Sequence, residues 1–209
     1  MNRFIALAVC AVFAAAILIP AHAAERVPNF KLEGVDGKTY ELKVIAKDCK
    51  VILIDFWDSS CKPCRKMMPH LQTYYEVYQA AGLEVVVIAR DTTLTVSKVK
   101  PMVAAEGWTF PVLYDTGQKV SNAYHVKYSP VTFVVSNKGE ILFQHAGYKP
   151  GQEKALEEAV IKGLGLTEEE VEKLYAEHDE EDSAETAEEA AVDEDSANAP
   201  EEIAPGDSS

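Results

Sequence analysis

One stretch constrains the fold of this chain more than any other: an aliphatic run, residues 51–54, followed within ten residues by Cys61 and Cys64. The run Val-Ile-Leu-Ile is typical of a central strand buried on both faces, and a helix is predicted to begin at the cysteines. The free N–H groups and dipole of a helix N-terminus favour negative charge, here a thiolate. Spacing i, i+3 also brings the two sulfurs within disulfide reach.

The surroundings of the pair favour reactive thiols. Three basic residues flank the cysteines: Lys62, Arg65 and Lys66. Their charge is expected to lower the thiol pKa further, although Asp58 offsets part of this effect. Cys61, at the helix mouth, is expected to be the exposed nucleophile, and Cys64, one turn further, the shielded resolving thiol. The pair is therefore predicted to switch between dithiol and disulfide.

Asp55 is a carboxyl group inside an otherwise apolar strand. If it is buried, its pKa should be raised, which suits a general base that takes the proton from Cys64. The alternative is that Asp55 sits in water at the end of the strand.

These residues resemble a known family. Asp55-Phe56-Trp57, Cys61-Lys62-Pro63-Cys64 and Pro69 are similar to the corresponding motifs of thioredoxin. The wider pattern resembles the TlpA/ResA-like branch of extracytoplasmic thiol–disulfide oxidoreductases, over about residues 27–163. Residues 27–32 and 36–42 are similar to the N-terminal hairpin of that branch, and residues 128–133 to its cis-proline loop.

The resemblance implies a function and a site. It implies protein disulfide exchange, with Cys61, Cys64 and Asp55 as catalytic residues and a Cys61–Cys64 disulfide in the oxidised form. It implies a cis Ser129–Pro130 bond, although X-Pro bonds are cis in only ~5–6% of folded cases. The expected substrate-binding residues are Trp57, Lys62, Pro63, Ser129 and Pro130. A reductant is favoured, for example in the maturation of cytochrome c or metalloproteins, with a membrane-linked electron donor.

Two positions depart from the branch and leave the redox potential and the choice of partner open. Met67 stands where an acidic residue is common, and Ser60 where a tryptophan is common. One alternative is therefore a disulfide oxidant or isomerase. Another, of a different class, is a non-catalytic binding module in which the cysteines form a permanent structural disulfide.

Metal binding competes for any two-cysteine motif, but a structural zinc site needs four ligands. The remaining histidines are scattered singly: His70, His125 and His145. We expect no metal, no cofactor and no nucleic-acid partner, and a monomer that acts on protein thiols and disulfides. Cys49, left over, is expected to be a partly buried structural thiol.

The order of expected elements defines an α/β class, a thioredoxin fold with a mixed central sheet flanked by helices and an N-terminal β-hairpin extension. Strands are expected at about 51–57, 83–89, 110–115, 131–136 and 141–145. Helices are expected at about 61–81, 93–106, 118–125 and 152–162, the last stopped by Gly163.

The two ends of the chain differ from this domain, which is expected to span residues 24–166. Residues 1–23 have a basic start, an apolar run and a small-x-small site, as in a secretory signal peptide, so a periplasmic protein is expected. An uncleaved membrane anchor is the second choice. Residues 167–209 hold 18 acidic residues and one lysine, so the net charge of −14 belongs to this tail. A short helix over 167–178, capped by Thr167, and disorder from Asp179 onward are predicted.

Overall fold

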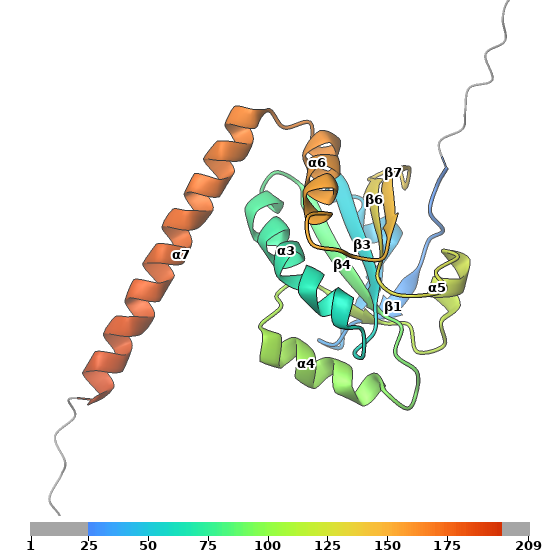
Figure 1. The fold of residues 1–209 in the computed structure, drawn as a ribbon, viewed down its shortest axis with the longest axis horizontal. Coiled ribbons are helices and arrows are strands. Elements are labelled where there is room, and N and C mark those ends of the chain that lie inside the picture. Colours follow the sequence, from blue (N-terminus) through green and yellow to red (C-terminus); the bar gives the residue numbers. More distant parts are fainter. Residues whose placement is uncertain (1–24, 198–209) are drawn as a thin grey trace, which may run out of the picture.

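Figure 1 shows the computed structural model, which describes residues 25–197. The predicted signal peptide and residues 198–209 of the tail lie outside this range. None of the helices within the described residues is both long enough and apolar enough to cross a membrane.

A five-stranded sheet forms the centre of the domain, in the order β5-β4-β3-β6-β7. Its strands are β3 (Val51–Trp57), β4 (Leu83–Ala89), β5 (Val112–Tyr114), β6 (Val131–Ser136) and β7 (Ile141–Ala146). Neighbours β3, β4 and β5 are parallel, whereas β6 runs antiparallel to β3 and β7 antiparallel to β6. This mixed sheet confirms the predicted thioredoxin-like class.

Every residue of β3 is buried, so its side chains alternate between two apolar layers. Val51, Leu53 and Trp57 face the layer formed with α3 (Lys62–Tyr78) and α6 (Glu153–Leu164). Residues 52, 54 and 56 face the opposite layer, which the N-terminal segment, α2 (Leu42–Ile45) and α5 (Lys119–Ala123) complete. Asp55 lies between Leu53 and Trp57 in this alternation, so it shares the first face, the one toward α3 and α6.

Strands β3, β4 and β6 have the predicted bounds, and most of the other predicted elements are present with different bounds. The N-terminal hairpin consists of β1 (Lys31–Glu33) and β2 (Thr39–Glu41), and α2 follows it without having been predicted. The helix after the cysteines ends at Tyr78 and continues through Pro69. In place of the helix expected over residues 93–106, the structure has η1 (Val96–Lys98) and α4 (Val99–Glu106). Gly107, with a φ of +68°, is the C-cap residue of α4.

The predicted stop of α6 at Gly163 is wrong, because the helix ends at Gly165, whose φ of +76° is left-handed. Gly163 has a different role inside the helix. A Cβ at this position would lie 2.9 Å from Cγ2 of Val51 and 3.0 Å from Cδ1 of Leu142. The glycine therefore permits a close approach of α6 to the sheet.

The acidic tail differs from the prediction of disorder from Asp179, because α7 (Glu168–Ala197) is a continuous helix. The tail has too few large apolar residues to form a packed core. This composition does not exclude a helix, because alanine and glutamate have high helix propensity. The predicted Thr167 cap is present as a reciprocal pair: Glu170 N–H donates to Thr167 Oγ1 at 3.3 Å, and Thr167 N–H donates to Glu170 Oε2 at 2.8 Å.

The start of α7 packs on the domain through three apolar side chains, those of Val171, Leu174 and Tyr175. The ring of Tyr175 meets that of Tyr78 edge-on, with centroids 6.0 Å apart. Figure 1 shows the helix running on beyond the domain.

Candidate functional site

The cysteine pair lies where β3 ends and α3 begins. Cys61 is the N-cap residue of α3, and its sulfur accepts a hydrogen bond from Cys64 N–H at 3.2 Å. The structure contains a disulfide between Cys61 and Cys64, whose Cα atoms are 5.3 Å apart. Pro63 occupies the first turn, where its missing N–H leaves no hydrogen bond unmade.

The two cysteines differ in accessibility. Cys61 is partly exposed, whereas Cys64 is 0% exposed and belongs to the core. The predicted exposed and shielded positions are therefore those seen. The basic side chains beside them, Lys62, Arg65 and Lys66, are all exposed. An external sulfur can reach Cys61 but not Cys64.

Asp55 is buried, with 1% of its surface exposed, which excludes the alternative of a carboxyl in water. Its Oδ1 accepts a hydrogen bond from Thr132 Oγ1 at 2.7 Å, and its Oδ2 has no hydrogen-bond partner among the described residues. Burial raises the pKa of Asp55 to about 7, although the Thr132 hydrogen bond opposes the shift. The carboxyl group can therefore exchange a proton near neutral pH.

Thr132 was not predicted, although the register of the sheet places it directly beside Asp55 on β6. Its next neighbour across the ladder is His145 on β7. The three residues thus form one row across three strands. Beside this row is a cavity of about 10 Å³, close to the minimum for one water molecule. It is lined by Met67, Thr132, Phe143, His145, Tyr148, Gln152, Glu153 and Leu156.

The second wall of the site is the loop before β6. The Ser129–Pro130 peptide bond is cis, in agreement with what the resemblance implied. Because Val131 pairs with Phe56, this loop lies beside the end of β3 that leads to the cysteines. Pro130 is buried and Ser129 partly exposed. Ser129 Oγ accepts a hydrogen bond from Arg90 Nη1 at 3.0 Å.

The prediction that Trp57 binds substrate needs a correction. Its side chain is 0% exposed and packs edge-on against Trp108, with ring centroids 5.2 Å apart. The alternation of β3 turns it into the layer under α3, because it lies two residues beyond Asp55. In the structure it supports the site from below.

Cys49, outside the site, is the partly buried thiol that was expected. Its sulfur donates to Ile45 O at 3.3 Å, and burial raises its pKa to about 11. A thiol with so high a pKa is almost wholly protonated at neutral pH.

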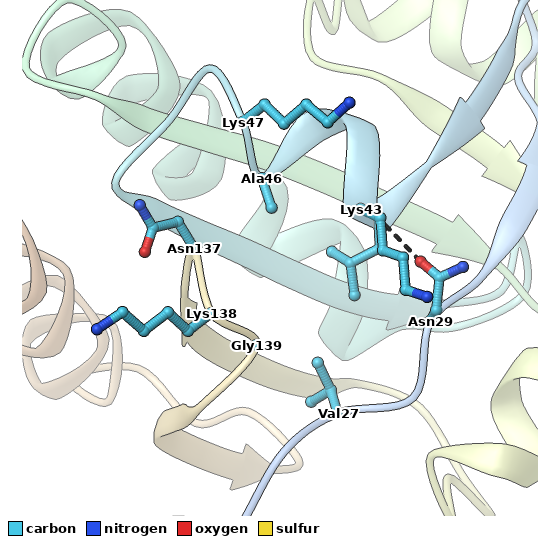
Figure 2. Close-up of a pocket in the computed structure, with 9 residues that line it drawn as sticks. Val27, Asn29, Lys43, Ala46, Lys47, Asn137, Lys138 and Gly139 are labelled. Atoms are coloured by element: carbon cyan, nitrogen blue, oxygen red, sulfur yellow. Dashed lines mark hydrogen bonds between the residues drawn. The ribbon is translucent and has the colours of Figure 1, made fainter.

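Within residues 25–197, no three side chains of His, Cys, Asp or Glu are grouped so that they could hold a metal ion. A surface pocket lined by Asn137 lies at the other end of the sheet. Its position is given by the hydrogen bond that Asn137 N–H donates to Lys50 O, just before β3 begins. Figure 2 shows Lys47 and Lys138 extending away from this pocket in different directions. Their ammonium groups do not converge on a common ligand.

Fold, cysteine pair and cis-proline loop together define a thioredoxin-like thiol–disulfide oxidoreductase. Residues 23–144 match the AhpC/TSA family, and the chain belongs to this family. Within it, the chain belongs with the thiol-disulfide oxidoreductases called ResA.

Two relatives called ResA are similar to this chain over most of their own length. ResA of Halalkalibacterium halodurans is 34% identical over 128 residues, which cover 61% of this chain and 70% of the relative. ResA of Bacillus anthracis is 36% identical over 123 residues, 59% of this chain and 69% of the relative.

Among solved structures, a Chlorobium tepidum protein described as a thiol:disulfide interchange protein DsbE has a TM-score of 0.62. It is 28% identical, over 68% of this chain and 96% of its own. StoA from Bacillus subtilis has a TM-score of 0.53 and 23% identity over 64% and 96%, which supports the fold alone.

Proposed function

We propose that the protein reduces disulfides of extracytoplasmic proteins, with Cys61 as the nucleophile and Cys64 as the resolving thiol. The observation that carries this proposal is the unequal exposure of two cysteines at the start of α3, which follows the strand that holds the buried carboxyl of Asp55. A purely structural disulfide has no need of one reachable sulfur, nor of an ionisable group kept out of water on the strand that leads to it.

The exchange proceeds in two displacements. In the reduced protein, the Cys61 thiolate attacks one sulfur of a substrate disulfide, forms a mixed disulfide and releases the other sulfur as a thiolate, which takes a proton from solvent. The Cys64 thiolate then attacks Cys61 Sγ, forms the Cys61–Cys64 disulfide and releases the second substrate thiolate. Two electrons pass from the protein to the substrate.

Asp55 serves the second displacement. Cys64 is buried and must lose its proton to attack, and a carboxylate with a pKa of about 7 is a base of matched strength. The proton then passes from Asp55 to the departing substrate thiolate or to water.

The substrate binds across the mouth of the site. The exposed Lys62 and Pro63 form one side, and the backbone of Ser129 before cis-Pro130 offers hydrogen bonds to an extended substrate segment. Trp57 is excluded from this surface by its burial.

The proposed compartment rests on the composition of residues 1–23, and the proposed electron donor on the direction of the reaction. Residues 1–23 act as a signal peptide that directs residues 24–166 to the periplasm, where disulfides persist. A reductant there needs renewed electrons, so a membrane-linked dithiol donor returns the Cys61–Cys64 disulfide to the dithiol form. The protein works as a monomer.

A trapping experiment tests the exchange reaction. We expect reduced Cys64→Ser to form a stable mixed disulfide with a disulfide-bonded model peptide, visible as a mass increase that dithiothreitol reverses. Cys61→Ser should form none, and the matched control, Cys49→Ser combined with Cys64→Ser, should trap the peptide as well as Cys64→Ser does. Failure of Cys64→Ser to trap the peptide favours the non-catalytic binding module.

The direction of electron flow is tested by the equilibrium reduction potential of the pair in glutathione or dithiothreitol buffers. A value near that of thioredoxin, about −270 mV, is expected for a reductant. A value near the oxidant end of the scale, about −120 mV, means that the protein makes or shuffles disulfides instead.

A further inference from the structure

Two charged residues follow directly after β4, at the edge of the sheet where the site lies. Arg90 N–H donates to Trp57 O at 2.8 Å, so this segment stays beside the end of β3. Because β3 and β4 are parallel and β6 starts beside Phe56, three loops meet at this edge. They are residues 58–61, residues 90–95 and residues 126–130.

Asp91 holds the loop that carries the nucleophile. The carboxylate is 3% exposed and takes two hydrogen bonds from the same residue, Ser59. Its Oδ2 accepts from Ser59 N–H at 2.8 Å, and its Oδ1 accepts from Ser59 Oγ at 2.6 Å. Ser59 lies two residues before Cys61, so this double contact fixes the turn from which α3 starts.

Arg90 holds the opposite wall. Its guanidinium is largely buried, with 9% exposed, and donates to three oxygens of the segment that leads to cis-Pro130. The acceptors are Ser121 Oγ at 3.2 Å, Ser129 Oγ at 3.0 Å and Val126 O at 3.3 Å. Loss of Arg90 therefore releases the cis-proline loop at several points at once.

The charge of Arg90 is compensated only indirectly. Among the described residues no carboxylate lies within 4.0 Å of its guanidinium; Ser121 Oγ instead donates to Asp115 Oδ2 at 2.7 Å and links the two charges. Burying a cation without a direct partner is unfavourable. A neutral residue at this position would avoid the free-energy cost of burying a cation. We therefore infer that the charge of Arg90 is used to hold the cis-proline loop by hydrogen bonds.

We propose that Arg90 and Asp91 are positioning residues that set the two walls of the exchange site from one point. Arg90 acts on substrate binding through Ser129, whose hydroxyl hydrogen stays free to donate because the guanidinium occupies an oxygen lone pair. Asp91 acts on the nucleophile through Ser59. This inference rests on the proposed function and adds to it the element that aligns substrate and nucleophile.

The test compares two oxidants of the reduced protein: a disulfide-bonded peptide, which needs the cis-proline wall, and bis(2-hydroxyethyl) disulfide, a linear disulfide that is too small to use it. Arg90→Met should raise KM for the peptide about tenfold, with kcat and the rate with the small disulfide changed less than twofold, since hydrogen bonds to charged groups are worth about that factor. Arg90→Lys should recover part of the loss. Arg26→Met, which breaks only an exposed pair with Glu140 at 3.0 Å, is the matched control and should match the unmodified protein.

Asp91→Asn should act differently, because an amide can accept only one of the two Ser59 hydrogen bonds through its oxygen. Its rate should fall about tenfold with both oxidants, while KM for the peptide stays within twofold.

The outcomes separate the two proposals. An unmodified protein that reacts with neither oxidant overturns the proposed function. An active protein whose Arg90→Met variant keeps its KM, or loses rate equally with both oxidants, overturns the positioning role of Arg90. If Arg90→Met does not fold, as judged by its thermal transition, Ser129→Ala removes the acceptor instead and must raise KM for the peptide selectively.

Discussion

The two ends of the central sheet differ in how far their charged side chains are buried. At the end where β3 and β4 finish, three charged or ionisable groups are buried and held by hydrogen bonds: Asp55, Arg90 and Asp91. At the end where β3 begins, the pocket of Figure 2 is bordered by exposed lysines. Burial of such groups opposes folding, so it is found where the chemistry requires it. The contrast is one of degree, because Glu84, near the start of β4, is partly buried and burial raises its pKa.

The largest effect is expected from the nucleophile at the reactive end. Cys61→Ala should lower the rate of peptide disulfide reduction at least about a thousandfold, because no other thiol among residues 25–197 is both accessible and placed at a helix N-terminus. Cys49→Ala is the control and should stay within twofold, since its high pKa keeps that thiol protonated. Comparable losses in both variants would contradict the assignment.

Asp55→Asn should slow the resolution of the mixed disulfide about a hundredfold, the usual contribution of a positioned base. In the unmodified protein that step should accelerate as pH rises through about 7, because only the deprotonated carboxylate accepts a proton. Rapid-mixing measurements from pH 5 to 9 check both points. Persistence of the same inflection in Asp55→Asn would assign it to another group.

The same carboxyl should make stability depend on pH. Its folded-state pKa, about 7, lies above the unfolded value of 3.8, so the folded state binds this proton more tightly. The stabilisation is complete below the unfolded pKa and is lost as pH rises through the folded one. Between pH 5 and 8 the unmodified protein should lose about 2–3 kcal/mol of unfolding free energy relative to Asp55→Asn. Denaturant titrations of the two oxidised proteins measure this difference, and parallel pH profiles would refute it.

The smallest effects are expected at the opposite end. Lys47→Gln and Lys138→Gln should change the unfolding free energy by less than about 0.5 kcal/mol, as is usual for exposed positions. Peptide reduction should stay within twofold. A clear loss of activity in either variant would remove the contrast between the two ends and point to a second functional surface there.

Local pattern predicted much of the reactive end. The aliphatic run gave β3 and the cysteine spacing gave the start of α3, because both depend on neighbours in the chain. The position of Asp55 within an apolar strand favoured burial but left a carboxyl in water as the alternative, which its 1% exposure excludes. The cis bond at Pro130 came from the family resemblance, since sequence alone favours trans.

What local pattern missed depends on long-range contacts. Thr132 meets Asp55 only through the register of β3 with β6. Arg90 and Asp91 were not singled out from the sequence, because their partners lie some 30 to 40 positions away. The assignment of Trp57 to substrate binding came from the family resemblance, whereas its place in a strand buried on both faces favoured the burial that the structure shows.

Gly163 has a consequence for the spacing between layers of the molecule. A hydrogen atom where any other residue carries carbon lets α6 rest on Val51 and Leu142. Leu156 and Glu153 of the same helix bound the cavity beside Thr132, and Glu157 accepts the hydroxyl of Tyr78 at 2.8 Å. One missing methyl group, 17 residues beyond the end of β7 (163 − 146), therefore sets the distance between α6 and the sheet beside Thr132, the partner of Asp55.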